Sequence, residues 1–245
     1  MRSLAVIGHL SRDVVAGAPP RIGGGPWHAG RALRLSDANA LLVAKSGDAD
    51  HERQLASLGS PVTFVPDVET TSFSFSYDER GVRTMRVDAI GTPWRVDELP
   101  DGLPGWVFVA TLLRGDAGPD VLERLARTSN VLLDGQGLAR ARETGALVLD
   151  GDFDRRLLRH VRAVKLSEEE ADAVGEIDVP ELIVTHGLRG ATVNGEFVPA
   201  RAVATDPTGA GDAFAAGYVA ARAQGEDPLP AARRATALVE ALLSQ

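Results

Sequence analysis

Residues 206–214 read Asp206-Pro207-Thr208-Gly209-Ala210-Gly211-Asp212-Ala213-Phe214, a segment with two glycines that runs into an apolar stretch. Pro207 disfavours a helical conformation for the residue before it, so a helix is expected to begin only after the glycines. The first N–H groups of a helix have no partner inside the helix, and the helix dipole adds partial positive charge there. Gly209 and Gly211 let the backbone bring these groups to one point, which predicts an anion site suited to phosphate.

Asp212 has two interpretations. An aspartate in the first turn of a helix stabilises the helix dipole, and the stretch taken alone indicates no more than that. It also lacks the lysine of a P-loop and the glycine spacing of a dinucleotide-binding turn. If a phosphoryl group lies on the amides, the same carboxylate can take the proton of an attacking hydroxyl, while the amides and Mg²⁺ stabilise charge on the transferring group.

The composition limits the classes of function. The chain has 245 residues, of which 44% are hydrophobic and 24% charged, the usual balance of a globular protein. Its net charge of −8 argues against nucleic-acid binding and favours a small-molecule partner. Cysteine is absent and the five histidines have no metal-ligand spacing, so a disulfide framework and a zinc site are not expected. No stretch has the length of a membrane span or the layout of a signal peptide, which predicts a cytoplasmic protein without membrane contacts.

Apolar strands alternate with helical segments along most of the chain, and neither an internal repeat nor a linker divides it. This alternation predicts an α/β domain over 1–245, with a parallel sheet covered on both faces and ligands at the carboxyl ends of the strands. Ser167 and Glu170 have the spacing of a capping box, and Asp134 ends a strand without an assigned role. Strands are expected at 4–8, 41–44, 106–110, 131–134, 163–166 and 182–185. Helices are expected at 27–35, 50–58, 119–127, 154–160, 168–174, 209–223 and 229–243.

One region departs from this pattern. Residues 71–77 alternate polar and aromatic side chains, 78–81 supply a turn, and 82–87 alternate again. A period of two with one apolar face predicts a hairpin that stands apart from the buried strands. We expect a small β lid, formed from about 11–22 and 62–93, that closes over a substrate or pairs two copies of the chain, so that the protein is a monomer or a homodimer through the lid.

The stretch at 206–217 resembles the C-terminal signature of the ribokinase-like (PfkB) carbohydrate kinases, D-T-x-G-A-G-D-x-F. Four further segments, at 8–13, 23–29, 165–170 and 184–190, resemble other motifs of that family and occur in the same order. The resemblance implies a ribokinase-like three-layer αβα fold with a mostly parallel central sheet and a β-hairpin lid. It also implies a kinase that uses ATP and Mg²⁺ to phosphorylate a hydroxyl of a sugar or polyol.

The resemblance further implies roles for individual residues. It makes Asp212 the general base, and the amides of Gly209, Ala210 and Gly211 the anion hole. Glu170 is implied in an indirect contact with the metal, through water. The implied substrate contacts are Asp13, Gly24, Gly25 and His28. The implied nucleotide contacts are Lys165, Ser167, Thr185, Gly187, Gly190 and Thr208.

Two residues depart from the family pattern, since His28 and Ser167 stand where asparagine is usual. An imidazole offers one donor and one acceptor when neutral, so the preferred substrate can differ. Residues 131–137 with Arg140 resemble a compact subgroup that includes inositol kinase-like proteins. Two alternatives remain, a nucleoside kinase of the same family and a sugar- or nucleotide-binding protein that has lost catalysis. A nucleotide-cofactor oxidoreductase is set aside because no G-x-G-x-x-G follows the first strand.

Overall fold

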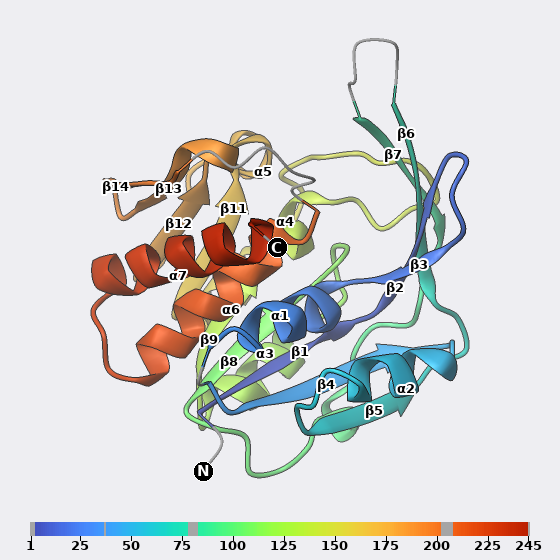
Figure 1. Cartoon of the computed structure of the whole chain (residues 1–245), viewed down its shortest axis with the longest axis horizontal. Helices are drawn as coiled ribbons and strands as arrows, with labels where there is room; N and C mark the ends of the chain where they lie inside the picture. The colour runs from blue at the N-terminus through green and yellow to red at the C-terminus, as the bar shows by residue number, and fades with distance from the viewer. Residues whose placement is uncertain (1–2, 37, 78–82, 202–207, 245) are drawn as a thin grey trace.

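The computed structural model describes residues 3–36, 38–77, 83–201 and 208–244, which form two sheets and their covering helices (Figure 1). The larger sheet contains β1 (Leu4–His9), β4 (Ala40–Ser46), β5 (Val62–Pro66), β8 (Trp106–Ala110), β9 (Asn130–Asp134), β11 (Ala163–Ser167), β12 (Glu181–Thr185), β13 (Gly190–Val193) and β14 (Glu196–Pro199). The smaller sheet contains β2 (Ser11–Val15), β3 (Arg21–Gly23), β6 (Thr71–Tyr77), β7 (Arg83–Ala89) and β10 (Gly145–Ala146). The helices are α1 (Gly25–Leu33), α2 (Asp50–Ala56), α3 (Pro119–Ala126), α4 (Gln136–Ala139), α5 (Glu168–Val174), α6 (Ala210–Ala223) and α7 (Pro228–Leu243), with short 3₁₀ turns at Val96–Glu98, Arg155–His160 and Gly187–Arg189.

The larger sheet has the strand order β14-β13-β12-β11-β9-β8-β1-β4-β5. From β5 to β12 every neighbouring pair is parallel. β13 and β14 extend the sheet in the antiparallel direction. The expected α/β class with a mostly parallel central sheet is therefore confirmed, and the carboxyl ends of its parallel strands lie along one edge.

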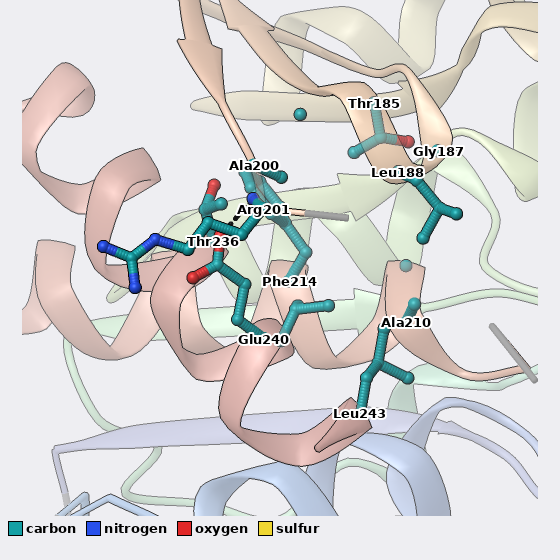
Figure 2. A pocket seen from close by; sticks show the side chains of 13 residues that line it. Thr185, Gly187, Leu188, Ala200, Arg201, Ala210, Phe214, Thr236, Glu240 and Leu243 are labelled. Atoms are coloured by element: carbon teal, nitrogen blue, oxygen red, sulfur yellow. Dashed lines mark hydrogen bonds between the residues drawn. The ribbon is translucent and has the colours of Figure 1, made fainter. Parts of the chain in front are cut away.

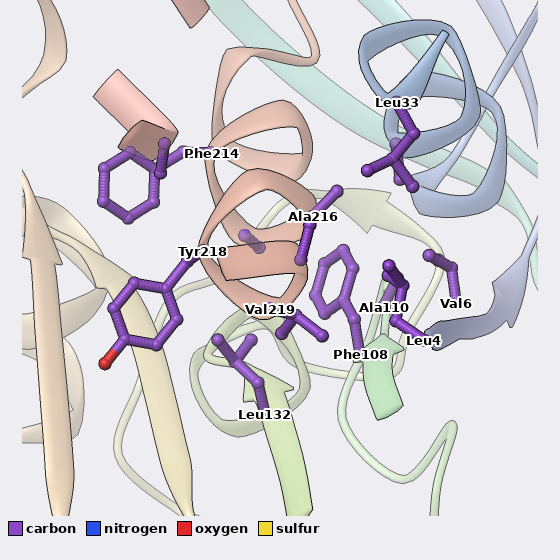
Figure 3. Packing of buried hydrophobic residues seen from close by; sticks show 14 of the residues in the cluster. Leu4, Val6, Leu33, Phe108, Ala110, Leu132, Phe214, Ala216, Tyr218 and Val219 are labelled. Carbon is purple, nitrogen blue, oxygen red and sulfur yellow. The ribbon is translucent and has the colours of Figure 1, made fainter. Parts of the chain in front are cut away.

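Helices cover both faces of this sheet because its strands are apolar on both sides. Leu4 and Val6 belong to the buried cluster that includes α1, α6 and α7, whereas Ala5 and Ile7 belong to the cluster that includes α3 and α5. Figure 3 shows Phe108 packed beneath α6 in the first cluster. Full burial of such a side chain contributes about 1.5–3 kcal/mol, so the core holds α6 firmly against β8 and its neighbours β1 and β9.

The smaller sheet, of order β10-β7-β6-β2-β3, stands beside the carboxyl edge of the larger one (Figure 1). Phe73, Phe75 and Val87 point from it toward Leu112 and Leu113, and together these five side chains form a separate buried cluster. The serines between the aromatic residues are more exposed, as the period of two predicts. The turn predicted at 78–81 lies outside the described residues.

The observed boundaries of the smaller sheet differ from the predicted ones. β5 pairs with β4 and so belongs to the larger sheet, although it lies inside the 62–93 segment assigned to the lid. β10, from a part of the chain where no strand was predicted, pairs with β7 at the edge of the lid. A five-residue apolar strand fits either sheet and a two-residue strand has no periodicity, so neither pairing is encoded locally.

The capping box predicted at Ser167 is confirmed. The Ser167 hydroxyl accepts the Glu170 N–H at 3.2 Å, and the Glu170 carboxylate accepts the Ser167 N–H at 2.9 Å, completing the capping box. The segment at 154–160 is a 3₁₀ helix rather than an α-helix. Within the described residues, no helix is both long and apolar enough to cross a bilayer.

Candidate active site

The first turn of α6 carries the unpaired amides that the sequence predicted. Gly209 precedes the helix in the left-handed conformation, with φ of 81°, which glycine adopts without strain. The first bond of the helix runs from the Ala213 N–H to the Gly209 carbonyl at 2.9 Å. The N–H groups of Ala210, Gly211 and Asp212 therefore have no partner inside the helix, and no side chain in the described part of the structure caps it. These groups can hold an anion.

Two cavities meet at this turn, because Gly211 lines both of them. The first, which we call the polar cavity, has about 650 Å³ of empty space including its mouth. The second, which we call the apolar cleft, has about 630 Å³ and is shown in Figure 2. The polar cavity is lined by Ser11, Asp13, Gly24, His28, Phe73, Phe75, Met85, Leu112, Gln136, Arg140, Thr208, Gly209, Gly211 and Asp212. The apolar cleft is lined by Thr185, Gly187, Leu188, Gly190, Ala200, Arg201, Ala210, Gly211, Phe214, Thr236, Val239, Glu240 and Leu243.

Asp212 faces the polar cavity with an unengaged carboxylate. The side chain is half-buried and forms neither a hydrogen bond nor an ion pair with any residue that the structure describes. Burial raises the pKa of Asp212 to about 6, against the lowering effect of the positive charges on Lys165 and Arg140. A carboxylate that titrates near neutral pH and has no partner is well suited to accept a proton from a bound hydroxyl.

Asp134 has a similar pKa but a different environment. Burial raises the pKa of Asp134 to about 6, and its side chain is inaccessible to solvent. Its oxygens accept bonds from the Lys165 ammonium, at 3.1 and 3.3 Å, and one of them also accepts the Gln136 N–H at 3.1 Å. With its oxygens engaged in this way, Asp134 is placed to position Lys165 rather than to exchange protons with a ligand.

Lys165 lies beneath the first turn of α6. A Cβ placed on Gly211 would be 3.1 Å from the Lys165 Nζ, so the ammonium is close to the helix start. Burial alone lowers the pKa of Lys165, but the carboxylates of Asp134, Glu170 and Asp212 outweigh it and raise the pKa above its ordinary value. A permanent positive charge thus reinforces the anion site from below.

Glu170 is buried and its two oxygens are already used. One accepts the Ser167 N–H, and the other lies 3.4 Å from the Arg140 guanidinium. Burial opposes ionisation, but the charges of Arg140 and Lys165 hold the pKa of Glu170 below its ordinary value. The carboxylate is therefore charged, and a bound metal would meet it most easily through a water molecule.

The charge balance of the site favours a divalent cation. Among the residues that the structure describes, Asp13, Asp134, Glu170 and Asp212 supply four carboxylates to the site, against the two cations Lys165 and Arg140. No group of three or more His, Asp or Glu side chains in the described part of the chain is arranged to hold a metal alone. Mg²⁺ usually binds through one or two carboxylates together with waters and substrate phosphates, so these residues fit a magnesium ion that binds together with a polyphosphate.

The predicted substrate residues converge on the polar cavity from β2, β3 and α1. Asp13 is buried and accepts the Ser11 hydroxyl at 2.8 Å. Gly23 allows this approach, since a Cβ there would collide with both side chains. Gly24, with φ of 91°, turns the chain from β3 into α1.

His28 and Gly25 connect α1 to the first turn of α6. A Cβ on Gly209 would collide with the His28 ring, so the imidazole lies directly against the helix start. A Cβ on Gly25 would come within 3.1 Å of an Asp212 oxygen, although Gly25 itself does not line the cavity. The N-termini of α1 and α6 thus meet around the carboxylate of Asp212.

The polar cavity also contains residues to which the sequence analysis gave no role in the site. Gln136 and Arg140 come from α4 and the residue after it, and the Arg140 Nε is buried without a hydrogen-bond partner among the described residues. Both come soon after the strand at 130–134, whose carboxyl end lies at the edge of the larger sheet where ligands are expected. This position was the signal in the sequence that could have pointed to them. Phe73, Phe75 and Met85 form the wall that the lid contributes.

The apolar cleft gathers some of the predicted nucleotide contacts and not others. Thr185, Gly187 and Gly190 line it, together with Ala210 and Gly211. Thr208 lines the polar cavity instead, and Lys165 and Ser167 line neither cavity. The opposite wall comes from α7, which the sequence analysis left unassigned because nothing in its amphipathic pattern distinguishes a cleft from solvent.

Comparison with known proteins gives a consistent result. Residues 154–244 match the model of the pfkB family carbohydrate kinases. The chain is 35% identical to inositol 3-kinase from Zea mays over 199 residues, which are 74% of this chain and 52% of the maize protein. It is 32% identical to inositol 3-kinase from Oryza sativa subsp. japonica over 212 residues, 76% of this chain and 53% of the rice protein. The chain thus spans about half the length of these relatives.

Solved structures agree with the fold. A pyrophosphate-dependent kinase in the ribokinase family superposes with a TM-score of 0.85 at 22% identity, covering 99% of this chain and 95% of that protein. A nucleoside kinase from Burkholderia thailandensis, in complex with inosine, superposes with a TM-score of 0.71 at 20% identity, covering 96% and 89%. Across both, the two-sheet architecture is shared along nearly the whole chain.

Proposed function

We infer that the chain belongs to the ribokinase-like (PfkB) carbohydrate kinase family, and from this premise we propose that it is an ATP-dependent kinase that phosphorylates a hydroxyl of a small polyol or sugar. The observation that carries the proposal is the meeting of two chemically different cavities at the first turn of α6, with the Asp212 carboxylate, which has no partner among the described residues, on one side. The polar cavity takes the acceptor and the apolar cleft takes the nucleotide.

The transfer follows from this arrangement. The acceptor hydroxyl donates its proton to Asp212 as its oxygen attacks the γ-phosphorus in line, and ADP leaves toward the apolar cleft. The amides of Gly209, Ala210 and Gly211 hold the phosphoryl oxygens, and the Lys165 ammonium beneath them adds positive charge. Asp134 keeps that ammonium in place. Loss of one well-aimed donor in such a site costs roughly 10²–10³ in turnover.

We further propose that Mg²⁺ accompanies the nucleotide. When bound, the ion neutralises charge on the phosphate oxygens. Glu170 would hold it through water, because both carboxylate oxygens of Glu170 are already engaged by Ser167 and Arg140. The excess of carboxylates over cations in the site supports this assignment.

We propose an inositol, or a closely related cyclic polyol, as the acceptor. The named relatives are inositol 3-kinases. The cavity supports the same class, because a polyol ring needs several hydrogen-bonding groups around its rim and apolar contacts on its faces. Asp13, His28, Gln136 and Arg140 supply the first, and the lid phenylalanines supply the second. His28, in place of asparagine, would set which hydroxyl pattern binds best.

We propose a nucleotide rather than free pyrophosphate as the donor, even though three of the similar structures are of pyrophosphate-dependent kinases. Leu188, which is 46% exposed, faces the cleft together with Val239 and Leu243. An apolar slot next to an anion site suits a heterocyclic base attached to phosphates, whereas free pyrophosphate has no apolar surface to bury. This feature supports ATP as the donor.

A nucleoside kinase is the second candidate. The aromatic wall formed by Phe73 and Phe75 in the polar cavity favours it, because a base can stack on such side chains, and a nucleoside kinase is among the similar structures. Both rings are largely buried in the cluster that includes the leucines at 112–113, which leaves little ring surface for a ligand. This burial makes the polyol the better-supported acceptor.

Donor consumption measured over a panel of acceptors tests the proposal. The panel contains inositols, hexoses and nucleosides, each assayed with ATP and with pyrophosphate in the presence of Mg²⁺. We expect turnover with ATP and an inositol. Turnover with nucleosides and with no other acceptor would establish the second candidate. If none of the acceptors is turned over, the result would support a binding protein that has lost catalysis.

A further inference from the structure

We propose that Glu240 of α7 selects the base of the phosphoryl donor, by accepting a hydrogen bond from an exocyclic amino group of a purine. The inference rests on the proposed function, because that function places the nucleotide in the apolar cleft. It adds a specificity-determining residue in a part of the chain that no sequence motif marks.

Glu240 presents a carboxylate whose orientation is fixed. Its side chain is half-buried and lines the cleft, and one oxygen accepts the Arg201 N–H at 2.6 Å. Figure 2 shows the Arg201 side chain extending away from Leu188 and Ala210, so its guanidinium does not reach across the cleft. In the described part of the chain Glu240 has no ion pair. A preoriented carboxylate with remaining acceptor capacity is therefore available to a ligand.

The other side chains of the cleft offer little competition for a polar ligand group. The Thr185 hydroxyl donates to the Leu166 carbonyl at 3.2 Å, and the Thr236 hydroxyl donates to the Ala232 carbonyl at 3.0 Å. Most remaining lining side chains are aliphatic or aromatic. Glu240 is thus the charged side-chain acceptor in an otherwise apolar surface, and in such a surface a single hydrogen bond has a large effect on affinity.

Glu240 also lies at the correct end of the cleft. Gly217 of α6 lies near Ala235 and Leu238 of α7, and Ala210 at the start of α6 lies near Leu243 at the end of α7, so the two helices run in opposite directions. Figure 2 shows Leu243 next to Ala210 at the phosphate end. Glu240 precedes Leu243 by three residues, or about 5 Å along the helix, on the side away from the anion site. The phosphates bind at the start of α6, so the base end of a nucleotide extends toward Glu240.

The chemistry of a carboxylate defines which base fits. A carboxylate accepts hydrogen bonds and donates none, so it attracts an amino group and repels a carbonyl oxygen. Adenine carries an amino group at position 6, and hypoxanthine carries an oxygen there. A base that presents an oxygen at position 6 leaves a carboxylate directed at that position desolvated and unpaired, which is the situation that gives strong discrimination. The same negative charge disfavours free pyrophosphate in the cleft.

Equilibrium binding of Mg·ATP and Mg·ITP, measured by isothermal titration calorimetry, tests the inference. We expect the wild-type protein to bind ATP at least about tenfold more tightly than ITP. Glu240→Gln keeps an acceptor for the Arg201 N–H but can also donate to an oxygen, so the ATP:ITP ratio should fall to within about twofold. Glu52→Gln, an exposed change on α2, should leave the ratio at its wild-type value.

Three results would overturn the inference. They are equal binding of ATP and ITP by the wild-type protein, an unchanged ratio in Glu240→Gln, and pyrophosphate that competes as well as ATP. A contact with the ribose instead of the base would appear as an altered ratio of ATP to 2′-deoxy-ATP in Glu240→Gln with no change for ITP. Because these measurements need no acceptor and no turnover, the inference can fail while kinase activity is present, and it can hold if no acceptor is found.

Discussion

The two cavities that meet at Gly211 differ in how each could select a ligand. The polar cavity is surrounded by charged and hydrogen-bonding groups, among them Asp13, Arg140 and Asp212, and one wall comes from the small sheet. The apolar cleft is built from α6, α7 and the β12–β13 connection, with Glu240 as its carboxylate. Hydrogen bonds can discriminate strongly between ligands with different patterns of hydroxyl groups, whereas apolar contacts mainly exclude ligands whose shape does not fit the cleft. The polar side should therefore set acceptor identity, and the apolar side should set donor class.

The same contrast separates two carboxylates of similar pKa. Burial raises the pKa of both Asp134 and Asp212 to about 6. Asp134 is bound by Lys165 and the Gln136 amide, while Asp212 has no partner within the described residues. A raised pKa alone therefore does not identify the base. The combination of a raised pKa, an open carboxylate and an adjacent anion site does.

The largest expected effect is that of Asp212→Asn. The amide has the same shape but cannot accept the proton, so kcat should fall by about 10²–10⁴ with a small change in KM. Steady-state kinetics with the best acceptor of the panel measures this loss. Thermal unfolding should show a protein at least as stable as wild type, because the variant removes a desolvated, unpaired charge.

Asp134→Asn is the matched comparison on the other carboxylate. It should also reduce kcat, but with a lowered unfolding temperature, because it leaves the buried Lys165 ammonium without its ion-pair partner. Equal activity losses with equal stability losses in both variants would contradict the separate roles given to the two residues.

Arg140→Met should have an intermediate effect, larger on the acceptor side than on the donor side. Its guanidinium lines the polar cavity and lowers the pKa of Asp212. We expect KM for the acceptor to rise by about tenfold and the acidic limb of the pH–rate profile to move to higher pH. Arg140→Lys keeps the charge and should restore the position of the limb. If the acidic limb stays in place in Arg140→Met, the charge of Arg140 does not lower the pKa of Asp212.

Leu188→Asp should have the smallest effect, confined to the donor side. The substitution places a charge on the apolar wall of the cleft, so KM for ATP should rise by about three- to tenfold while KM for the acceptor stays the same. Kinetics with each substrate varied in turn measures both values. An increase in the acceptor KM equal to that for ATP would contradict the division into two cavities.

The sequence predicted the layers of the fold because the buried strands and amphipathic helices carry their own periodicity. The helix start at Gly209, the capping box at Ser167 and the lid hairpin at 71–77 all have local signals, and the described part of each is observed. The pairing of β5 and β10 was missed because strand partners are chosen by the rest of the sheet.

The candidate site was predictable where a motif marks it and not elsewhere. Asp13, His28 and Asp212 come together as the motifs implied. Arg140 and Gln136 carry only a positional signal, since each follows a strand end. Glu240 carries none, because its role depends on α7 packing beside α6 and on the Arg201 N–H that orients its carboxylate. Such residues emerge only when distant segments are brought together.

The pH dependence of kcat/KM in the wild-type protein tests the central assignment most directly. Asp212 must be ionised to accept a proton, and its pKa is raised to about 6, so the rate should be full above that pH and fall as the pH drops through it. The profile is measured with saturating Mg·ATP and the best acceptor. A limb near pH 6 with a slope of one, absent from the residual activity of Asp212→Asn, is the predicted result. A rate that stays constant down to the pH range of an ordinary aspartate, or a limb that persists in Asp212→Asn, would contradict Asp212 as the base.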